Sequence, residues 1–270
     1  MSIKLIALDL DGTLLNAKKE ISRANQEALR AARKQGVKVV ITTGRPLPAV
    51  EIFLKELDLM RSDEYSITFN GGLVQTNDGG ILDEIGFGIE AVEAIYQTTQ
   101  ALGLPLDVVH GGDVYVLPAA VASLYPTCNA LLNYIPVKFE DLPQHMEFNK
   151  AVSACEVDFL DGQIPNIPES LHNQFEIFKS REILLEWSPK GVHKAEGLAK
   201  LIGHLGIKQA EVMACGDEDN DLSMIDWAGL GVCMANGSDQ VKQVADIITP
   251  MTNEEDAVAW AIRKYVLGEE

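Results

Sequence analysis

Short runs of apolar residues alternate with stretches of helical periodicity along the first part of the chain. The apolar runs are typical of strands buried on both faces, and they cover residues 3–8, 37–43 and 65–69. Between them we expect one helix that is capped by Ser22 and stopped by Gly36, and a second helix over residues 47–59. This order of strands and helices predicts a parallel sheet.

The pattern changes after Gly71. Residues 73–76 and 81–85 flank a turn with the sequence NDGG, which predicts a hairpin. The following stretch, residues 87–187, mixes helical periodicity with short strand-like pieces, as in a small α+β domain. We expect its helices over 89–102 and 167–175, and its strands over 106–110, 114–118, 150–157 and 183–187.

The alternation of strands and helices returns after Pro189. The expected elements are a helix over 194–205 that Gly206 ends, a strand over 211–215, a helix through Met224 and Trp227, and strands over 230–235 and 246–249. We therefore predict an α/β fold with a Rossmann-like parallel-sheet core, residues 1–86 and 188–270. An inserted α+β cap over residues 87–187 interrupts this core.

Two carboxylates, Asp9 and Asp11, follow the first predicted strand. Residues two apart in an extended chain point the same way, so we expect these side chains to lie close together. Like charges at short range need a cation, and Mg²⁺ takes oxygen ligands from carboxylates and phosphate. The pair therefore indicates phosphoryl chemistry, with an ordinary acidic turn as the alternative.

Two more polar segments fall at the carboxyl ends of predicted strands, where open α/β sheets bind ligands. Thr43, Gly44 and Arg45 offer a hydroxyl, backbone amides and a guanidinium to a phosphate, or else form a turn that caps a helix. The run GDEDND contains Asp217, Asn220 and Asp221, and its alternative is an acidic helix N-terminus. Lys194 opens a helix, where a lone lysine is usually a surface charge.

The segments DLDGT, TTGR, a lysine before a helix, and GDEDND occur in the order of the four motifs of the haloacid dehalogenase superfamily of phosphatases, which this chain resembles. The FNGG segment at Asn70, the stretch ending at Lys194, and the position of the insert resemble its Cof-type sugar phosphatase subfamily. One departure is visible, because the third motif reads HKAEG where many relatives have glycine directly after the lysine.

The resemblance implies a role for each matching residue. Asp9 matches the nucleophile and Asp11 the general acid and base, and Mg²⁺ is held by the counterparts of Asp9, Asp217 and the backbone carbonyl of Asp11. Asp221 matches a residue that supports the metal ligands, and Arg45 and Asn70 are expected to support the site. The positions that match phosphate contacts are the backbone at Leu10, with Thr43, Gly44, Lys194 and Asn220.

Charge and cysteine content limit the partners. The chain has 22 basic and 40 acidic residues and a net charge of −18, which opposes binding to nucleic acid or to an anionic membrane. No stretch is long enough to span a bilayer, and the N-terminus lacks the features of a signal peptide. The widely spaced cysteines, Cys128, Cys155, Cys215 and Cys233, indicate core thiols of a cytoplasmic protein.

These observations predict a Mg²⁺-dependent phosphatase of small phosphorylated metabolites, with sugar phosphates as the expected class. The alternatives are a sugar phosphomutase, a phospho-accepting regulatory module, and a binding protein without catalysis. We expect residues 87–187 to move as a cap hinged near Phe87 and Pro189, with Glu186 and His110 as candidates for contact with the leaving group. The pattern does not indicate the oligomeric state.

Overall fold

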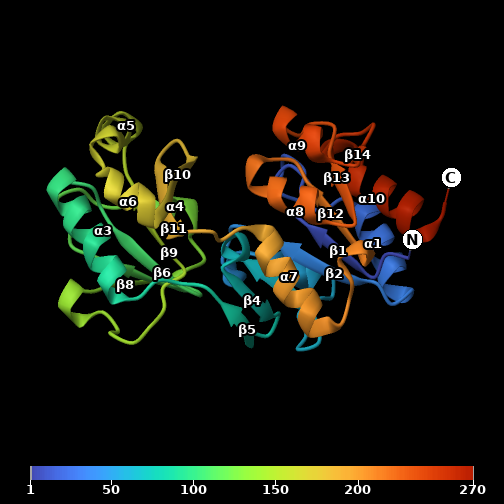
Figure 1. Cartoon of the computed structure of the whole chain (residues 1–270), viewed down its shortest axis with the longest axis horizontal. Coiled ribbons are helices and arrows are strands. Elements are labelled where there is room, and N and C mark those ends of the chain that lie inside the picture. The colour runs from blue at the N-terminus through green and yellow to red at the C-terminus, as the bar shows by residue number, and fades with distance from the viewer. Residues whose placement is uncertain (1, 270) are drawn as a thin grey trace. The chain divides into compact units, whose positions relative to one another are not determined.

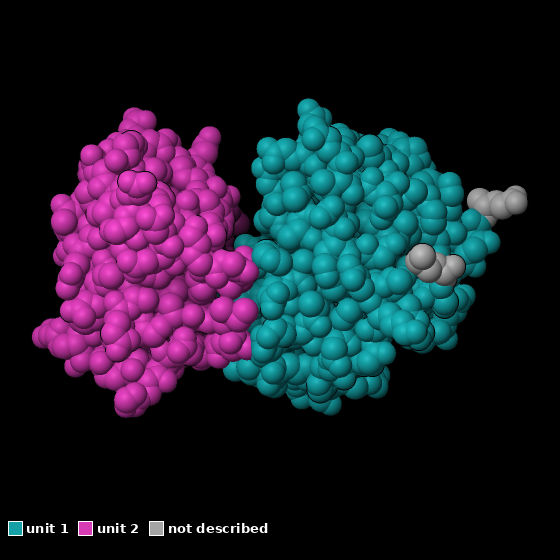
Figure 2. Space-filling view, in the orientation of Figure 1, with its two compact units in different colours: residues 1–83, 193–270 teal, residues 84–192 magenta. Residues whose placement is uncertain are grey.

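The computed structural model describes residues 2–269 of the chain (Figure 1). It divides into two compact units, residues 1–83 with 193–270, and residues 84–192 (Figure 2). The predicted insert boundaries, 87 and 187, lie inside the second unit. Within residues 2–269, no helix combines the length and apolar character needed to cross a membrane.

Within the described residues, the first unit is built on an eight-stranded sheet in the order β14-β13-β12-β1-β2-β3-β4-β5. Its strands are β1 (Leu5–Leu8), β2 (Lys38–Thr42), β3 (Tyr65–Thr68), β4 (Leu73–Thr76), β5 (Ile81–Glu84), β12 (Val212–Gly216), β13 (Leu230–Cys233) and β14 (Ile247–Ile248). From β14 to β3 all neighbours are parallel, and β4 turns back antiparallel to β3. The predicted fold class is confirmed.

Side chains of β1 alternate between the two faces of this sheet. Ile6 and Leu8 pack with the helices α1 (Arg23–Lys34), α2 (Glu51–Glu56) and α10 (Ala257–Ile262). Leu5 and Ala7 pack on the opposite face with α7 (Lys194–Leu205), α8 (Leu222–Trp227) and α9 (Asp239–Val244). Each fully buried aliphatic side chain contributes about 1.5–3 kcal/mol, so β1 is fixed from both sides and its carboxyl end is a rigid place for a site.

Local signals explain where these helices begin and end. Ser22 caps α1 by accepting a hydrogen bond from the Asn25 backbone N–H, and α7 ends at Gly206 in the left-handed conformation, as predicted. The predicted helix over 47–59 is too long. A 3₁₀ turn over Leu47–Ala49 precedes α2, and the left-handed backbone of Asp58 (φ 56°) ends the helical stretch. Further short helical turns cover Phe69–Gly71, Gln209–Glu211, Asp219–Asp221, Asn253–Glu255 and Arg263–Leu267.

The second unit has its own sheet, in the order β10-β11-β9-β6-β7-β8. Its strands are β6 (Asp107–His110), β7 (Asp113–Val116), β8 (Asn133–Pro136), β9 (Lys150–Ala154), β10 (Phe175–Arg181) and β11 (Leu184–Pro189). Its helices are α3 (Ile89–Leu102), α4 (Tyr125–Cys128), α5 (Val157–Gln163) and α6 (Glu169–Gln174), with 3₁₀ turns over Phe139–Asp141 and Ile164–Asn166. Val108, Ala151 and Trp187 form a core with residues of α3, α5 and α6.

Two strands of the second unit, β8 and β10, were not predicted. Much of β10 is exposed and polar, and both ends of β8 are exposed, so neither strand has the apolar run that marks its neighbours. The strand predicted over 150–157 ends at Ala154, and α5 begins at Val157. Cys155, Cys215 and Cys233 are buried and Cys128 is half-buried, all as free thiols.

Candidate active site

Three neighbouring parallel strands, β12, β1 and β2, end at the same edge of the first sheet. Asp9 follows β1, Thr43 follows β2, and Asp217 follows β12. The carboxyl edge of an open parallel sheet is where such folds bind ligands. The topology therefore brings together the three segments that the sequence suggested.

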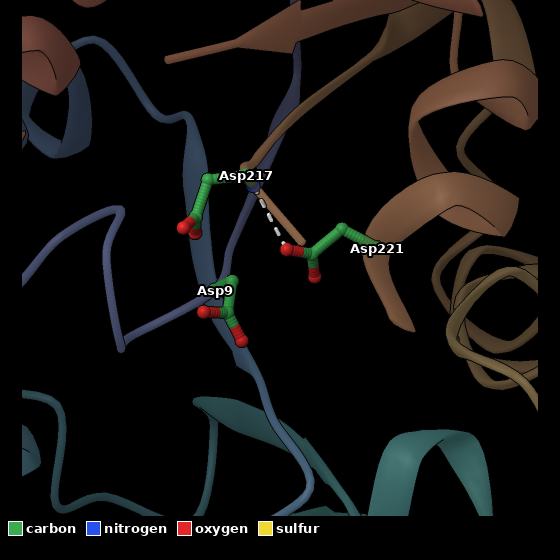
Figure 3. Close-up of side chains that lie close together, drawn as sticks. All are labelled: Asp9, Asp217 and Asp221. Atoms are coloured by element: carbon green, nitrogen blue, oxygen red, sulfur yellow. Dashed lines mark hydrogen bonds between the residues drawn. The ribbon is translucent and has the colours of Figure 1, made fainter. Parts of the chain in front are cut away.

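The centre of this edge is a cluster of three carboxylates, Asp9, Asp217 and Asp221 (Figure 3). Each offers an oxygen, and these oxygens lie within 4.8 Å of one another. All three side chains are buried, and Asp221 is fully so. The Asp221 Oδ2 atom accepts hydrogen bonds from the backbone N–H groups of Asp217 at 2.9 Å and Glu218 at 3.1 Å. The loop after β12 is thus closed on itself around Asp221.

Lys194 lies among these carboxylates and is itself fully buried. Its Nζ atom donates to Asp9 Oδ1 and to Asp221 Oδ1, both at 2.6 Å. It is the first residue of α7, whose N-cap is His193. The alanine after it leaves the lysine in place, and the close packing of this helix occurs at Gly197, where an added Cβ would lie 2.7 Å from Ile67.

The cluster carries more negative charge than its lysine can balance. With all three carboxylates ionised, three negative charges and one positive charge leave −2. Burial, together with the neighbouring Asp221 charge, raises the pKa of Asp9 from 3.8 to about 7. Burial likewise raises the pKa of Asp217 to about 7. Burial alone would lower the pKa of Lys194, but Asp221 and Asp9 outweigh it and raise that pKa. A divalent cation would neutralise this charge.

A tight turn carries the chain from Asp9 across Asp217. Gly12 has φ +81°, and a Cβ there would lie 2.1 Å from Asp217 Oδ2, so both the conformation and the contact require glycine. The next hydroxyl, Thr13 Oγ1, donates to Asp217 Oδ1 at 2.6 Å. The turn at Gly12 and the carboxylate of Asp217 are therefore held together.

Asp11 is not one of the three clustered carboxylates, and its side chain is instead paired with two cations. The strand ends at Leu8, so the alternation of an extended chain no longer applies two residues later. Its carboxylate accepts from Arg45, with Nη2 at 2.6 Å and Nε at 2.9 Å, and from Lys19 Nζ at 2.6 Å. Partial burial would raise the pKa of Asp11, but Lys19 and Arg45 outweigh it and lower that pKa.

The remaining candidates line the same edge. Thr43 is buried, and its Oγ1 accepts from the Arg45 backbone N–H at 3.2 Å. Asn70 has left-handed backbone (φ 55°) and its Oδ1 accepts from Asn220 Nδ2 at 3.2 Å. A Cβ on Gly44 would lie 3.0 Å from that same Asn70 oxygen, so the two loops touch. Leu10 is buried, with its carbonyl accepting from the Leu15 N–H at 2.8 Å.

The two candidates of the second unit have partners there. Glu186 on β11 is buried, and its carboxylate accepts from Lys150 Nζ at 2.8 Å and from Ser180 Oγ at 2.6 Å. His110 ends β6, and its Nδ1 lies 2.7 Å from the Glu147 carbonyl. These contacts give Glu186 a structural role in its own unit, and substrate contact by either residue stays a prediction.

The sequence interpretation missed three residues around Asp11. Lys19 pairs with its carboxylate, and Asn236 and Asn253 donate to the carbonyls of Gly12 and Leu15, both at 2.8 Å. A signal was available for Asn236, because it follows β13 at the same sheet edge. Lys19 and Asn253 lie in polar surface stretches that have no such marker.

Comparison with known proteins identifies the class. Residues 6–262 match the model of the haloacid dehalogenase-like hydrolases. A relative in Bacillus subtilis (strain 168), the 5-amino-6-(5-phospho-D-ribitylamino)uracil phosphatase YcsE, is 34% identical over 270 residues, covering 99% of this chain and 97% of the relative. The chain belongs to the haloacid dehalogenase-like hydrolases, as its motifs indicated.

Solved structures agree over nearly the whole chain. A haloacid dehalogenase-like hydrolase from Bacteroides thetaiotaomicron superposes with a TM-score of 0.86 at 31% identity, covering 97% of this chain and 99% of that one. The subclass IIB sugar phosphatase BT4131 superposes with a TM-score of 0.77 at 27% identity, covering 97% and 98%. Both units of the chain therefore have counterparts in this family.

Proposed function

We propose that this hydrolase is a phosphatase of small phosphorylated metabolites that works through an aspartyl-phosphate intermediate on Asp9. The observation that carries the proposal is the buried cluster of Asp9, Asp217 and Asp221 around Lys194, with its uncompensated charge at the end of β1. Carboxylates are ordinarily kept away from phosphate esters by repulsion. A site that gathers them with a buried cation suits a substrate that arrives together with a divalent metal.

The donor set fits Mg²⁺. Both oxygens of Asp221 already accept hydrogen bonds, Oδ1 from Lys194 and Oδ2 from two backbone N–H groups, so Asp221 supports the site rather than completing it. Asp9, Asp217 and the backbone carbonyl of Asp11 would hold the ion. When bound, Mg²⁺ neutralises charge on the carboxylates and on the substrate phosphate.

The residues of the chain divide the reaction between them. An Asp9 oxygen attacks phosphorus, and the bond from phosphorus to the leaving oxygen breaks as that oxygen takes a proton from Asp11. Because Lys19 and Arg45 lower the pKa of Asp11 in the free protein, this step requires that substrate binding weaken these ion pairs and leave Asp11 protonated. Asp11, now a carboxylate, then removes a proton from the water that attacks the aspartyl phosphate, which returns Asp9 and releases inorganic phosphate. Lys194, Thr43 and Asn220 stabilise the equatorial phosphoryl oxygens, whose charge is greatest in the transition state.

The substrate class follows from the chemistry that two relatives share. The names of YcsE and BT4131 specify a phosphorylated ribityl chain and a sugar phosphate. Both are phosphate monoesters of a polyhydroxylated carbon chain, and we extend that class to this protein. We assign the choice among such substrates to the second unit, residues 84–192, as the predicted cap.

The rival within the same chemistry is a sugar phosphomutase, which returns the phosphoryl group to a sugar instead of to water. The test incubates the protein and Mg²⁺ with a panel of sugar phosphates, nucleotides and 4-nitrophenyl phosphate, and measures inorganic phosphate and remaining ester together. Release of phosphate in step with loss of ester supports the phosphatase. Isomerised sugar phosphate without phosphate release would identify a mutase, and binding without turnover would exclude both.

A further inference from the structure

The segment after Asp11 is held from outside by the far end of the chain. We call residues 12–19 the acid turn, because it follows Asp11 directly and ends at the lysine that pairs with it. The Gly12 carbonyl accepts from Asn236 Nδ2 at 2.8 Å, and the Leu15 carbonyl accepts from Asn253 Nδ2 at 2.8 Å. The Ala17 N–H donates to Glu254 Oε1 at 2.6 Å.

Asn236 uses both ends of its amide. While Nδ2 donates to the Gly12 carbonyl, Oδ1 accepts from the Asn253 backbone N–H at 3.0 Å. These two contacts, one to an acceptor and one to a donor, fix which end of the amide faces the acid turn. The side chain is therefore oriented for donation to Gly12.

The loop that carries Asn236 also contacts the backbone of Asp217. The Asp217 carbonyl accepts from the Ser238 N–H at 2.8 Å, and an added Cβ at Gly237 would lie 3.1 Å from that carbonyl oxygen. One short loop after β13 thus contacts both the segment of Asp217 and the segment of Asp11. The loop therefore connects the segment that begins at Gly12 with the segment that contains Asp217.

Gly12 is the position where this matters most. Its left-handed backbone belongs to a residue with wide conformational freedom, and rotation there would move the rest of the acid turn, including the Lys19 that pairs with Asp11, relative to Asp9 and Asp11. The peptide after Gly12 is bonded through both of its polar groups, because Asn236 donates to the Gly12 carbonyl and the Thr13 N–H donates to the Leu10 carbonyl at 3.4 Å. The Thr13 hydroxyl adds a side-chain bond to Asp217. Removing the Asn236 amide leaves the carbonyl side of this peptide without its 2.8 Å bond.

We propose that Asn236 is a positioning residue that places Asp11 for proton transfer to the leaving group, by holding the carbonyl of Gly12. This inference rests on the proposed function. Asn236 acts through the acid turn and does not touch the reacting atoms. Its side chain is exposed, so its replacement creates no buried cavity.

The test uses two aryl phosphates of nearly equal shape, phenyl phosphate and 4-nitrophenyl phosphate. Phenol is a weak acid with a pKa of about 10, so its departure needs a proton from Asp11, whereas 4-nitrophenolate is a much better leaving group. The measured quantity is the ratio of kcat/KM for 4-nitrophenyl phosphate to that for phenyl phosphate. Because kcat/KM reports the steps up to departure of the phenol, the ratio isolates the protonation of the leaving group.

We expect Asn236→Ala to raise this ratio about tenfold by slowing phenyl phosphate selectively. Asn236→Asp, which keeps the shape but loses the donor, should raise it at least as much. Asp11→Asn gives the upper reference. The matched control is Asn166→Ala, which removes another exposed amide that donates to a backbone carbonyl, that of Gly162 at 3.1 Å, and should leave the ratio unchanged.

The outcomes distinguish failure of the proposed role of Asn236 from failure of the proposed phosphatase activity. Equal slowing of both substrates, or a wild-type ratio in Asn236→Asp, would show a merely structural role and overturn the inference while leaving the phosphatase intact. Failure of the wild-type protein to hydrolyse either ester would instead reject the proposed function. If Asn236→Ala does not fold, as judged by its thermal unfolding, Asn236→Asp decides by the same ratio.

Discussion

Each unit of the molecule contains a buried lysine that is bonded to a carboxylate, yet the two lysines lie in different electrostatic surroundings. In the first unit Lys194 contacts Asp9 and Asp221 beside Asp217, so that one cation meets three carboxylates. In the second unit Lys150 pairs with the carboxylate of Glu186 at 2.8 Å. Burial alone would lower the pKa of Lys150, but Glu186 outweighs it and raises that pKa.

The difference shows what marks a reactive site among buried ion pairs. A buried pair of equal and opposite charges stabilises a unit only modestly once desolvation is counted, and its charge needs no further counterion. A buried cluster with excess negative charge is unfavourable until a cation binds, and the raised pKa values of Asp9 and Asp217 express that cost. Charge imbalance, more than burial, separates the two units functionally.

Removal of metal should have the largest effect. We expect treatment with EDTA to abolish phosphate release and added Mg²⁺ to restore it, because Lys194 balances only part of the charge of the first cluster. Mg²⁺ should also raise the thermal midpoint of the wild-type protein by binding the folded state, and Asp217→Asn should lose that shift. Full turnover in metal-free buffer would contradict the interpretation of the cluster.

Exchange of each lysine for methionine should have different effects, on activity for Lys194 and on stability for Lys150. Lys194→Met should lower kcat/KM by at least about 10²–10³-fold, because a cation at the phosphoryl oxygens is lost. Lys150→Met should instead destabilise the protein by about 3–5 kcal/mol, since Glu186 is left buried and unpaired. The double variant Lys150→Met with Glu186→Leu should recover most of that stability in denaturant unfolding. No recovery would show that the second pair is not a simple balanced pair.

The pH dependence of stability in EDTA should carry the signature of the first cluster. Asp217 has a folded pKa of about 7 against 3.8 as its ordinary value, so the folded protein holds this proton more tightly. Stability from this group is therefore present below about pH 4 and is lost as the pH rises towards 7, by up to about 4 kcal/mol. Asp217→Asn should match the wild type at low pH and exceed it at pH 8. Parallel curves for the two proteins would contradict the raised pKa.

The smallest expected effect concerns substrate choice by the second unit. His110→Ala should alter the ranking of sugar phosphates by a few fold while sparing 4-nitrophenyl phosphate, because the chemistry belongs to the first unit. Glu186→Gln tests the other candidate, whose carboxylate is already engaged by Lys150 and Ser180. Initial rates over the same panel measure both variants. An unchanged ranking in both would remove these residues from the specificity assignment.

The sequence was informative where local pattern determines position. Asp9, Thr43 and Asp217 each follow an apolar strand, and parallel strands necessarily end at one edge, so their convergence could be predicted. The pairing of Asp11 with Arg45 and Lys19 could not, because it joins side chains from separate segments of the chain. Asn236 lies 224 residues from the carbonyl it holds, and no periodicity encodes such a contact.

The central claim is that Asp9 carries the phosphoryl group, and it can be tested directly in the Asp11→Asn variant with 4-nitrophenyl phosphate. The good leaving group allows the first step, while loss of the base should slow attack by water, so the intermediate accumulates. After rapid acid quench, mass spectrometry should find one phosphoryl group on the peptide that contains Asp9, and none when Asp9→Asn is added. A phosphoryl group elsewhere, or steady turnover by Asp9→Asn, would contradict the account.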